Sequence, residues 1–206
     1  MESQLPHHED GSGVGRRRML GIALGAGLVP ALGASAAANA EPAPSEPDMA
    51  AAALGRRVAE IATAQIGVPY AWGGGDRLGA SYGFCDGENG YLDGVCLGEN
   101  TVGYDCSGLS LYCWYLASHG RIELAHYTVA QFNRSAEVPR DAMLPGDLIF
   151  FSRPDAILHH VGIYAGDGAM IHAERTGTVV ARVEKVLDVP RWADEFAGAR
   201  RPHPAG

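Results

Sequence analysis

The segment from Cys106 to Ser118 constrains the fold more than any other part of the chain, because apolar side chains surround the helix that it predicts. Apolar residues recur from Cys106 at the i, i+3 and i+7 spacing of one helical face, and Leu111 and Trp114 make the other face apolar. A helix that is apolar all round lies in the centre of a domain. Asp105, directly before it, is a favourable N-cap residue. The sequence therefore predicts a central, buried helix that begins at Cys106.

The order of the other expected elements indicates an α+β domain. A helix is predicted over residues 55–66 and a short one over 126–132. The predicted strands come later and cover residues 147–151, 160–165, 169–173, 178–183 and 196–200. Helices followed by strands are typical of the α+β class. We therefore expect an antiparallel sheet that packs against the central helix.

The first 40 residues have the order of an export signal. Arg16, Arg17 and Arg18 precede a weakly apolar run of small residues, which ends at Ala40 in the sequence Ala-Asn-Ala. A basic region, an apolar region and a small-residue cleavage site follow one another in this way in signal peptides. Paired arginines favour the twin-arginine route. The alternative is an uncleaved membrane anchor, which needs about 20 strongly apolar residues.

Composition and charge indicate how the rest of the chain is organised. We expect a signal peptide at 1–40, a linker at 41–53, which is rich in Pro, Glu and Ala, and one folded domain at 54–206. The formal net charge of −8 argues against a nucleic-acid partner, because phosphates are bound by clustered basic side chains. After removal of the signal we expect a monomer that is secreted or held in the cell envelope, without stable membrane insertion.

Cys106, at the start of the predicted central helix, is a candidate nucleophile. Unpaired backbone N–H groups and the positive end of the helix dipole favour an anion there, so we expect a stabilised thiolate. The small residues Ser107 and Gly108 leave room for a substrate across the helix end. A nucleophilic cysteine also needs a nearby imidazole. Without one, Cys106 is an inert buried cysteine.

Two histidines on adjacent predicted strands can supply that imidazole. If residues 166–168 (Gly-Asp-Gly) form a three-residue hairpin loop, Gly162 faces His172, and His160 and His172 become diagonal neighbours on one face. Gly162 then leaves the space opposite His172 open. A two-residue loop instead puts His172 on the opposite face. The pattern leaves both registers open.

His159 is the competing candidate for the base, but alternation along a strand places it on the face opposite to that of His160. A zinc site formed by His159, His160 and His172 is a further alternative. No carboxylate clusters with these histidines in the sequence, and no C-x-x-C spacing occurs. We therefore expect neither a metal nor another cofactor.

Cys85 and Cys96 are expected to form a disulfide that pins the long glycine-rich segment 76–103. Cys106 and Cys113 lie on one predicted helix with about 10 Å between their Cα atoms, which is too far for a disulfide. Cys106 has to stay free to react, and Cys113 is expected to be a buried core thiol. Disulfides persist outside the cytoplasm, so export favours a bridge between the remaining two cysteines. Two free thiols or a metal-binding pair are the alternatives.

Five short motifs occur in order along the expected domain. They are Pro-Tyr-x-Trp-Gly-Gly at 69–74, Tyr-Asp-Cys-Ser-Gly-Leu at 104–109, Pro-Gly-Asp-Leu-Ile-Phe-Phe at 145–151, His-Val-Gly-Ile-Tyr at 160–164 and Ile-His-Ala at 171–173. Together they resemble the NlpC/p60 family of bacterial cell-wall cysteine peptidases, and the resemblance covers about residues 55–200. It implies a papain-like core within an NlpC/p60 catalytic domain at 54–206.

For catalysis, the resemblance implies that Cys106 is the nucleophile, His160 the base and His172 the polar residue that orients the base. The backbone N–H of Cys106 is then part of the oxyanion hole. The implied substrate is a stem peptide of peptidoglycan, or a muropeptide, cut between D-γ-glutamate and a diamino acid through a thioester. The alternatives are an amidase or acyltransferase with the same fold, and a wall-binding protein without activity.

For substrate binding, the resemblance implies that Tyr70, Trp72, Asp105 and Ser107 line the groove. Asp105 and Ser107 lie near a free substrate amine in some members of the family. We also expect the segment 76–103 to border the groove, because it connects Trp72 to Asp105 along the chain.

Overall fold

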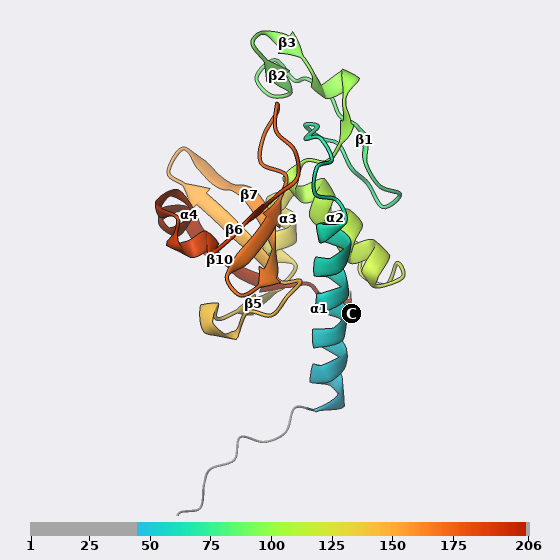
Figure 1. The fold of residues 1–206 in the computed structure, drawn as a ribbon, viewed down its shortest axis with the longest axis vertical. Coiled ribbons are helices and arrows are strands. Elements are labelled where there is room, and N and C mark those ends of the chain that lie inside the picture. The colour runs from blue at the N-terminus through green and yellow to red at the C-terminus, as the bar shows by residue number, and fades with distance from the viewer. Residues whose placement is uncertain (1–44, 205–206) are drawn as a thin grey trace, which may run out of the picture. The chain divides into compact units, whose positions relative to one another are not determined.

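A six-stranded antiparallel sheet with helices on both faces forms the centre of the structure, a computed structural model that describes residues 45–204 (Figure 1). The strand order is β5-β10-β6-β7-β8-β9. The strands are β5 (Ala136–Val138), β6 (Leu148–Arg153), β7 (Ala156–Gly166), β8 (Ala169–His172), β9 (Ala181–Val183) and β10 (Phe196–Arg201). The predicted α+β class and antiparallel sheet are confirmed, and the short edge strand β5 has no counterpart among the predicted strands.

Four α-helices accompany the sheet within residues 45–204. They are α1 (Glu46–Thr63), α2 (Cys106–Ala117), α3 (Thr128–Asn133) and α4 (Pro190–Glu195), with short 3₁₀ helices at Gly98–Asn100, Arg140–Ala142 and Val186–Asp188. Helices α1 and α2 pack together against one face of the sheet. On the other face, Trp192 of α4 packs against Ile149 and Phe151. Both faces of the sheet are therefore covered, although α4 was not among the predicted elements.

Helix α2 is the central buried helix that the sequence predicts. The Asp105 carboxylate accepts a hydrogen bond of 2.7 Å from the Gly108 backbone N–H, so Asp105 is the N-cap as expected. Leu109 and Cys113 are buried on one side of the helix and Trp114 on another. Since the body of the helix is fixed on several sides, its first residue is held in a defined position.

Helix α1 begins at Glu46, inside the segment 41–53 that we expected to be a linker. Ser45 and Asp48 form a capping box, in which each side chain bonds to the backbone N–H of the other residue. The first turns of this helix are exposed, and only its later residues pack against the domain. Residues 46–53 are therefore helical, although their composition is typical of a linker.

Two predictions concern the N-terminal part of the chain. The predicted export signal at 1–40, and the start of the predicted linker, lie outside the described residues. Within the part of the chain that the structure describes, no helix is both long enough and apolar enough to span a membrane.

The hairpin between β7 and β8 combines the two registers that the sequence leaves open. Next to the turn, Gly166 pairs with Ala169, as in a two-residue loop. The register then shifts at Ala165, so that Tyr164 pairs with Met170. An extra residue of this kind is a β-bulge. Beyond the bulge the strands follow the register of the three-residue loop, which puts the two candidate histidines on one face.

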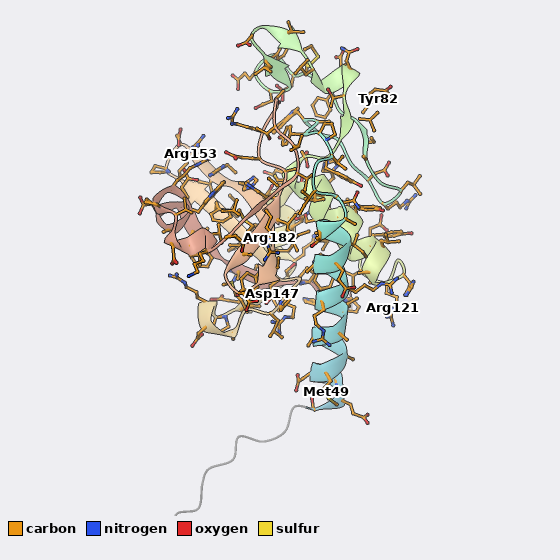
Figure 2. All side chains as sticks on the ribbon, in the orientation of Figure 1. Met49, Tyr82, Arg121, Asp147, Arg153 and Arg182 are labelled. Atoms are coloured by element: carbon orange, nitrogen blue, oxygen red, sulfur yellow. A yellow bond between two sulfur atoms is a disulfide. The ribbon has the colours of Figure 1, made fainter. Side chains whose placement is uncertain are left out.

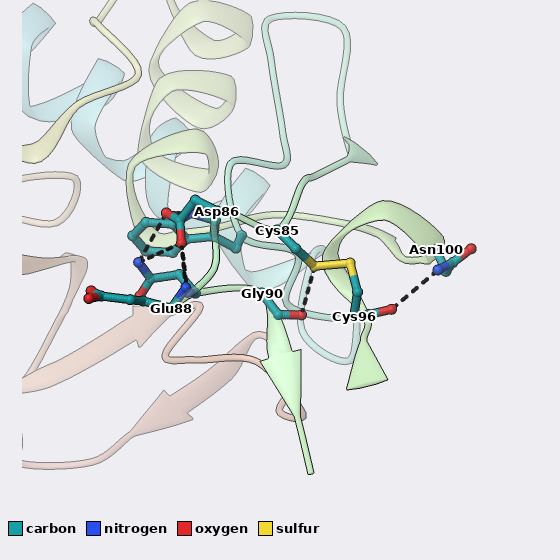
Figure 3. Close-up of a disulfide and its surroundings, with 8 residues drawn as sticks. Cys85, Asp86, Glu88, Gly90, Cys96 and Asn100 are labelled. Carbon is teal, nitrogen blue, oxygen red and sulfur yellow. Dashed lines mark hydrogen bonds between the residues drawn. A yellow bond between two sulfur atoms is a disulfide. The ribbon is translucent and has the colours of Figure 1, made fainter. Parts of the chain in front are cut away.

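The glycine-rich segment 76–103 contains the predicted disulfide between Cys85 and Cys96 (Figure 3). It also contains two small antiparallel sheets. These are β1 (Ser81–Tyr82) with β4 (Val102–Gly103), and β2 (Tyr91–Leu92) with β3 (Val95–Cys96). Cys113 is a buried free thiol, as expected. The segment is therefore an ordered, covalently closed insertion between the first helix and α2.

Candidate active site

Cys106 lies where the N-terminus of α2 meets strand β7. Its Sγ lies 3.9 Å from Thr128 Oγ1, and the nearby Val161 backbone acts to lower the pKa of the thiol. Val161 directly follows His160 in the chain, and Cys106 and His160 line the same surface depression. The fold therefore brings the thiol from α2 and the imidazole from β7 into one site.

His160 and His172 are joined by a hydrogen bond of 2.9 Å between His160 Nε2 and His172 Nδ1. Their ring centroids lie 5.1 Å apart with nearly perpendicular planes, and the two residues are only 3% and 2% exposed. Trp192 of α4 stacks on the His160 ring with the centroids 5.3 Å apart. The His160 ring is thus held by two neighbours, and its Nδ1 is the nitrogen left for the thiol.

Two glycines that were expected to leave open space near the site are instead close packing contacts. A Cβ at Gly162 would collide with the side chain of Met170, so the space beside the histidine pair is filled. A Cβ at Gly108 would collide with the carbonyl oxygen of Gly74 and crowd the His126 ring. Glycine is needed at both positions because neighbouring protein groups, rather than substrate, come close.

The pKa of the Cys106 thiol is raised to about 12. Burial is the largest cause, and the charge of Asp105 adds to it. Hydrogen bonds from Val161, Thr128 and the Ser107 backbone N–H act in the opposite direction. The expected stabilised thiolate is therefore wrong for the resting protein, since desolvation outweighs the helix terminus. The resting nucleophile is a thiol that loses its proton when it reacts.

Both histidines of the pair are neutral at neutral pH. Burial, together with His172, His159 and Arg191, lowers the pKa of His160 well below its usual value. Burial also lowers the pKa of His172 to about 4. A neutral His172 that accepts the His160 Nε2–H through its Nδ1 lone pair leaves Nδ1 of His160 unprotonated. That tautomer is the one a general base requires.

Cys106 lies where two depressions meet, and we call these the charged half and the apolar half of the groove. The charged half, of about 480 Å³, is lined by charged side chains from Glu88, Arg153, Glu174, Arg175 and Arg191. The apolar half, of about 440 Å³, is lined by Phe84, Tyr127, Val129, Ile157 and Leu158. Trp72, Cys106 and His159 line both halves. Figure 2 shows Arg153 on the sheet side of the molecule.

The insertion at 76–103 borders the groove, as expected from its position in the chain. The Trp72 indole N–H donates a hydrogen bond of 3.1 Å to Asp86 of the insertion. Leu92 of the β2–β3 hairpin packs over Gly177 in the loop between β8 and β9. Figure 1 shows this orange loop rising toward the hairpin. The insertion therefore forms one wall of the groove, and it contacts the loop between β8 and β9.

Tyr70 and Trp72 both line the charged half of the groove. Burial raises the pKa of Tyr70, and the nearby charge of Asp105 raises it further. Its hydroxyl therefore keeps its proton and is able to donate a hydrogen bond in the groove. The structure places these two residues where the sequence predicted them.

Asp105 and Ser107 lie at the groove but are engaged within the protein. Asp105 Oδ1 accepts hydrogen bonds from the Gly108 N–H at 2.7 Å, the Ser107 hydroxyl at 3.0 Å and His126 Nε2 at 2.9 Å. Its Oδ2 accepts a hydrogen bond of 3.1 Å from the Gly73 N–H. These contacts tie the Trp-Gly-Gly loop and the start of α2 together.

His159 lies close to the histidine pair, although we expected it on the opposite face. Its ring is nearly parallel to that of His160 at 6.3 Å, and its Nε2 donates a hydrogen bond of 3.1 Å to Glu195 of α4. Leu158 has φ of 49°, which interrupts the alternation of the strand just before His159. No group of three or more His, Cys, Asp or Glu side chains within 45–204 is arranged around one metal ion.

Three polar residues near the site were not identified from the sequence. His126 bonds to Asp105, and Thr128 lies beside the Cys106 sulfur. Gln131 is buried and donates to the backbone carbonyls of Ser107 and Ala125 at 2.9 and 2.8 Å. The available signal was a run of polar residues around the start of a short helix, which we interpreted only as secondary structure.

Comparison with known proteins relates the chain to one family. The profile of the NlpC/P60 family matches residues 67–201. The peptidoglycan endopeptidase RipA of Mycolicibacterium smegmatis is 43% identical over 116 residues, which are 56% of this chain and 20% of that protein. A gamma-D-glutamyl-L-lysine dipeptidyl-peptidase of Bacillus cereus is 35% identical over 109 residues, which are 52% of this chain and 31% of that protein.

The fold is similar to a solved structure of the peptidoglycan hydrolase RipB from Mycobacterium tuberculosis. The TM-score is 0.52 at 30% sequence identity, and the match covers 76% of this chain and 66% of that one. The sequence matches to RipA and to the Bacillus cereus enzyme span 20% and 31% of those two proteins. They nevertheless cover most of the domain described here.

Proposed function

This chain belongs to the NlpC/P60 family, and we propose that it is an exported cysteine peptidase that hydrolyses stem peptides of peptidoglycan. The bond that we assign is the one between D-γ-glutamate and the diamino acid. The observation that carries the proposal is the 2.9 Å hydrogen bond between His160 and His172, because it orients an imidazole toward the groove that also holds Cys106. The activities named for RipA and for the Bacillus cereus enzyme support the substrate class.

Acylation of Cys106 starts from a neutral thiol and a neutral imidazole. As Sγ attacks the carbonyl carbon of the peptide, the thiol proton passes to Nδ1 of His160. Coupling the two events avoids a free thiolate, which burial disfavours. The carbonyl oxygen becomes an oxyanion beside the Cys106 backbone N–H, which donates to no acceptor within residues 45–204. This N–H is therefore available to stabilise the tetrahedral intermediate.

The remaining steps return the enzyme to its resting state. The C–N bond breaks as His160 gives its proton to the leaving amine, and a thioester to Cys106 remains. Water then enters, His160 takes one of its protons, and the oxygen adds to the thioester carbonyl. Cleavage of the C–S bond releases the carboxylic acid, and the proton on His160 returns to the sulfur.

His172 acts as the positioning residue for the base. The transient imidazolium of His160 is buried, so it needs an acceptor for its Nε2–H. His172 supplies the Nδ1 lone pair at 2.9 Å and stays neutral because burial lowers its pKa to about 4. This division of roles follows the general logic of a catalytic triad.

The charged half of the groove supports a peptide with several carboxylates. Glutamate linked through its γ-carboxyl keeps a free α-carboxylate beside the scissile bond. Arg153 and Arg175 line this half, and guanidinium groups bind carboxylates through paired hydrogen bonds. A substrate outside the cytoplasmic membrane is also what the predicted export signal at 1–40 requires. We propose that the mature protein acts as a monomer.

The test is to incubate the full chain with defined muropeptides and to identify the products by mass spectrometry. We expect one new amine on the diamino acid and one new carboxylate on the D-glutamate γ-carbon, and no products with Cys106→Ala. Transfer of the acyl group to an added amine instead of water would indicate an acyltransferase. Binding without products would indicate a wall-binding protein and would contradict the proposal.

A further inference from the structure

The indole of Trp192, on helix α4, packs against both members of the histidine pair. It is stacked on the His160 ring, with an interplanar angle of 29° and 5.3 Å between the ring centroids. It meets the His172 ring nearly edge-on, at 84° and also 5.3 Å. Trp192 itself is 5% exposed. One buried side chain from outside the sheet therefore contacts the two histidines together.

This stacking supplies a restraint that the hydrogen bond between the histidines lacks. The χ2 torsion of a histidine has broad minima, so one hydrogen bond at Nε2 leaves the His160 ring able to tilt about its Cβ–Cγ bond. A flat indole against one face of the ring opposes that tilt, because tilting drives the edge of the ring into the indole. Nδ1 then keeps its direction toward the groove that also holds Cys106.

The same contact keeps water away from the pair. His160 and His172 are both buried, and Trp192 forms part of their cover. Burial is the largest cause of the lowered pKa of His160, and the neighbouring His172, His159 and Arg191 act in the same direction. An opening at the position of the indole would admit water, reduce the desolvation of His160 and raise its pKa toward the usual value.

Helix α4 is attached to the sheet on both sides of the indole. Arg191 donates a hydrogen bond of 2.6 Å to Glu174, in the loop after β8, and its Cζ lies 4.3 Å from the centroid of the Trp192 ring. At the end of the helix, Glu195 accepts a hydrogen bond of 3.1 Å from His159 of β7. Because α4 has only six residues, these contacts fix the place of Trp192.

We propose that Trp192 is a positioning residue that acts through His160: its indole holds the imidazole with Nδ1 toward Cys106 and excludes water from the hydrogen bond to His172. The inference rests on the proposed peptidase function and adds α4 to the parts of the fold that the reaction requires. Trp192 is not among the described residues that line either half of the groove, so it acts on the base rather than on the substrate.

The experiment removes the indole and compares the result with a matched change in the same buried cluster. Trp192→Ala opens the space beside the histidines, and Trp192→Phe keeps an aromatic ring there. Val186→Ala is the control, because Val186 is 1% exposed and belongs to the same buried cluster, on the 3₁₀ helix that precedes α4. For each full chain we measure kcat and KM on one muropeptide as a function of pH. We also titrate the His160 ring by nitrogen NMR without substrate.

Trp192→Ala is expected to lower kcat by about tenfold or more and to leave KM within about twofold, because a displaced base slows the reaction without changing the groove. The acid limb of kcat/KM should move to higher pH, since the exposed His160 of this variant takes up a proton where the buried imidazole stays neutral. The NMR titration of His160 should move in the same direction. Trp192→Phe should recover most of kcat and the wild-type acid limb, and Val186→Ala should keep that limb.

The outcomes separate this inference from the proposed function. A folded Trp192→Ala variant with the wild-type acid limb and an unchanged His160 titration overturns the positioning role. An equal shift of both in Val186→Ala does the same, because it assigns the effect to loosened packing in general. If Trp192→Ala does not fold, Trp192→Leu, which fills part of the space without a flat ring, carries the same prediction. If the wild type cleaves no muropeptide, the proposed function fails, and the NMR titration still decides whether Trp192 controls His160.

Discussion

His160 and His172 meet through a 2.9 Å hydrogen bond across β7 and β8, although the tight turn of this hairpin alone would place them on opposite faces. The extra residue Ala165 shifts the register between the turn and the histidines. A single β-bulge therefore assembles the pair.

Replacing His160 is expected to cost much more activity than replacing the adjacent His159. His160→Ala removes the general base, which contributes roughly 10²–10⁴-fold to the rate. His159→Ala removes a groove-lining side chain bonded to Glu195, so we expect a loss of less than about tenfold. Steady-state kinetics on one muropeptide would measure both. Equal losses would show that His160 is not the base.

The stability of the protein is expected to decrease in weakly acidic solution because of His172. Its pKa is about 4 when folded and near 6.5 when unfolded, so the unfolded chain binds the proton more readily. The contribution of neutral His172 is fully present above pH 6.5 and is lost as the pH falls toward 4. Between pH 7 and pH 5, the free energy of unfolding of the wild type should fall by about 2 kcal/mol more than that of His172→Gln. Denaturant unfolding at both pH values measures this, and parallel losses would contradict it.

The disulfide between Cys85 and Cys96 is expected to stabilise the groove wall without affecting the nucleophile. Closing a loop of this length contributes roughly 2–3 kcal/mol. Cys85→Ser combined with Cys96→Ser should lower the stability of the insertion and change the preference among muropeptides. The rate at which iodoacetamide labels Cys106 should stay the same. Loss of Cys106 labelling in the folded double variant would show that the insertion also positions the nucleophile.

Much of the fold follows from sequence patterns, because α2 and the sheet are strongly apolar. The geometry of the site could not be predicted in the same way, because it depends on local features that hydrophobic patterns do not contain. The register of the β7–β8 hairpin depends on one bulge, and neither loop length alone predicts it. The start of α1 depends on a local Ser45–Asp48 capping box inside a sequence with linker composition. The state of the Cys106 thiol depends on its burial, which the helix-terminus argument does not include.

The predicted export signal can be tested directly in cells. Replacing Arg16 and Arg17 with lysine keeps the charge but removes the paired arginines that favour the twin-arginine route. We expect the variant to stay in the cytoplasm, whereas the exported wild type begins at Glu41. Fractionation and N-terminal sequencing measure both outcomes. Normal export of the lysine variant would indicate the general secretory route.

The central claim is that Cys106 forms a thioester with the acyl part of the substrate. The most direct measurement is intact-protein and peptide mass spectrometry after mixing the full chain with a muropeptide and quenching with acid. We predict that the acyl group is found on Cys106 in the wild type and absent from Cys106→Ala, and that iodoacetamide labels Cys106 while the buried Cys113 stays unlabelled in the folded protein. Full turnover by Cys106→Ala, or an acyl group on any other residue, would contradict the account.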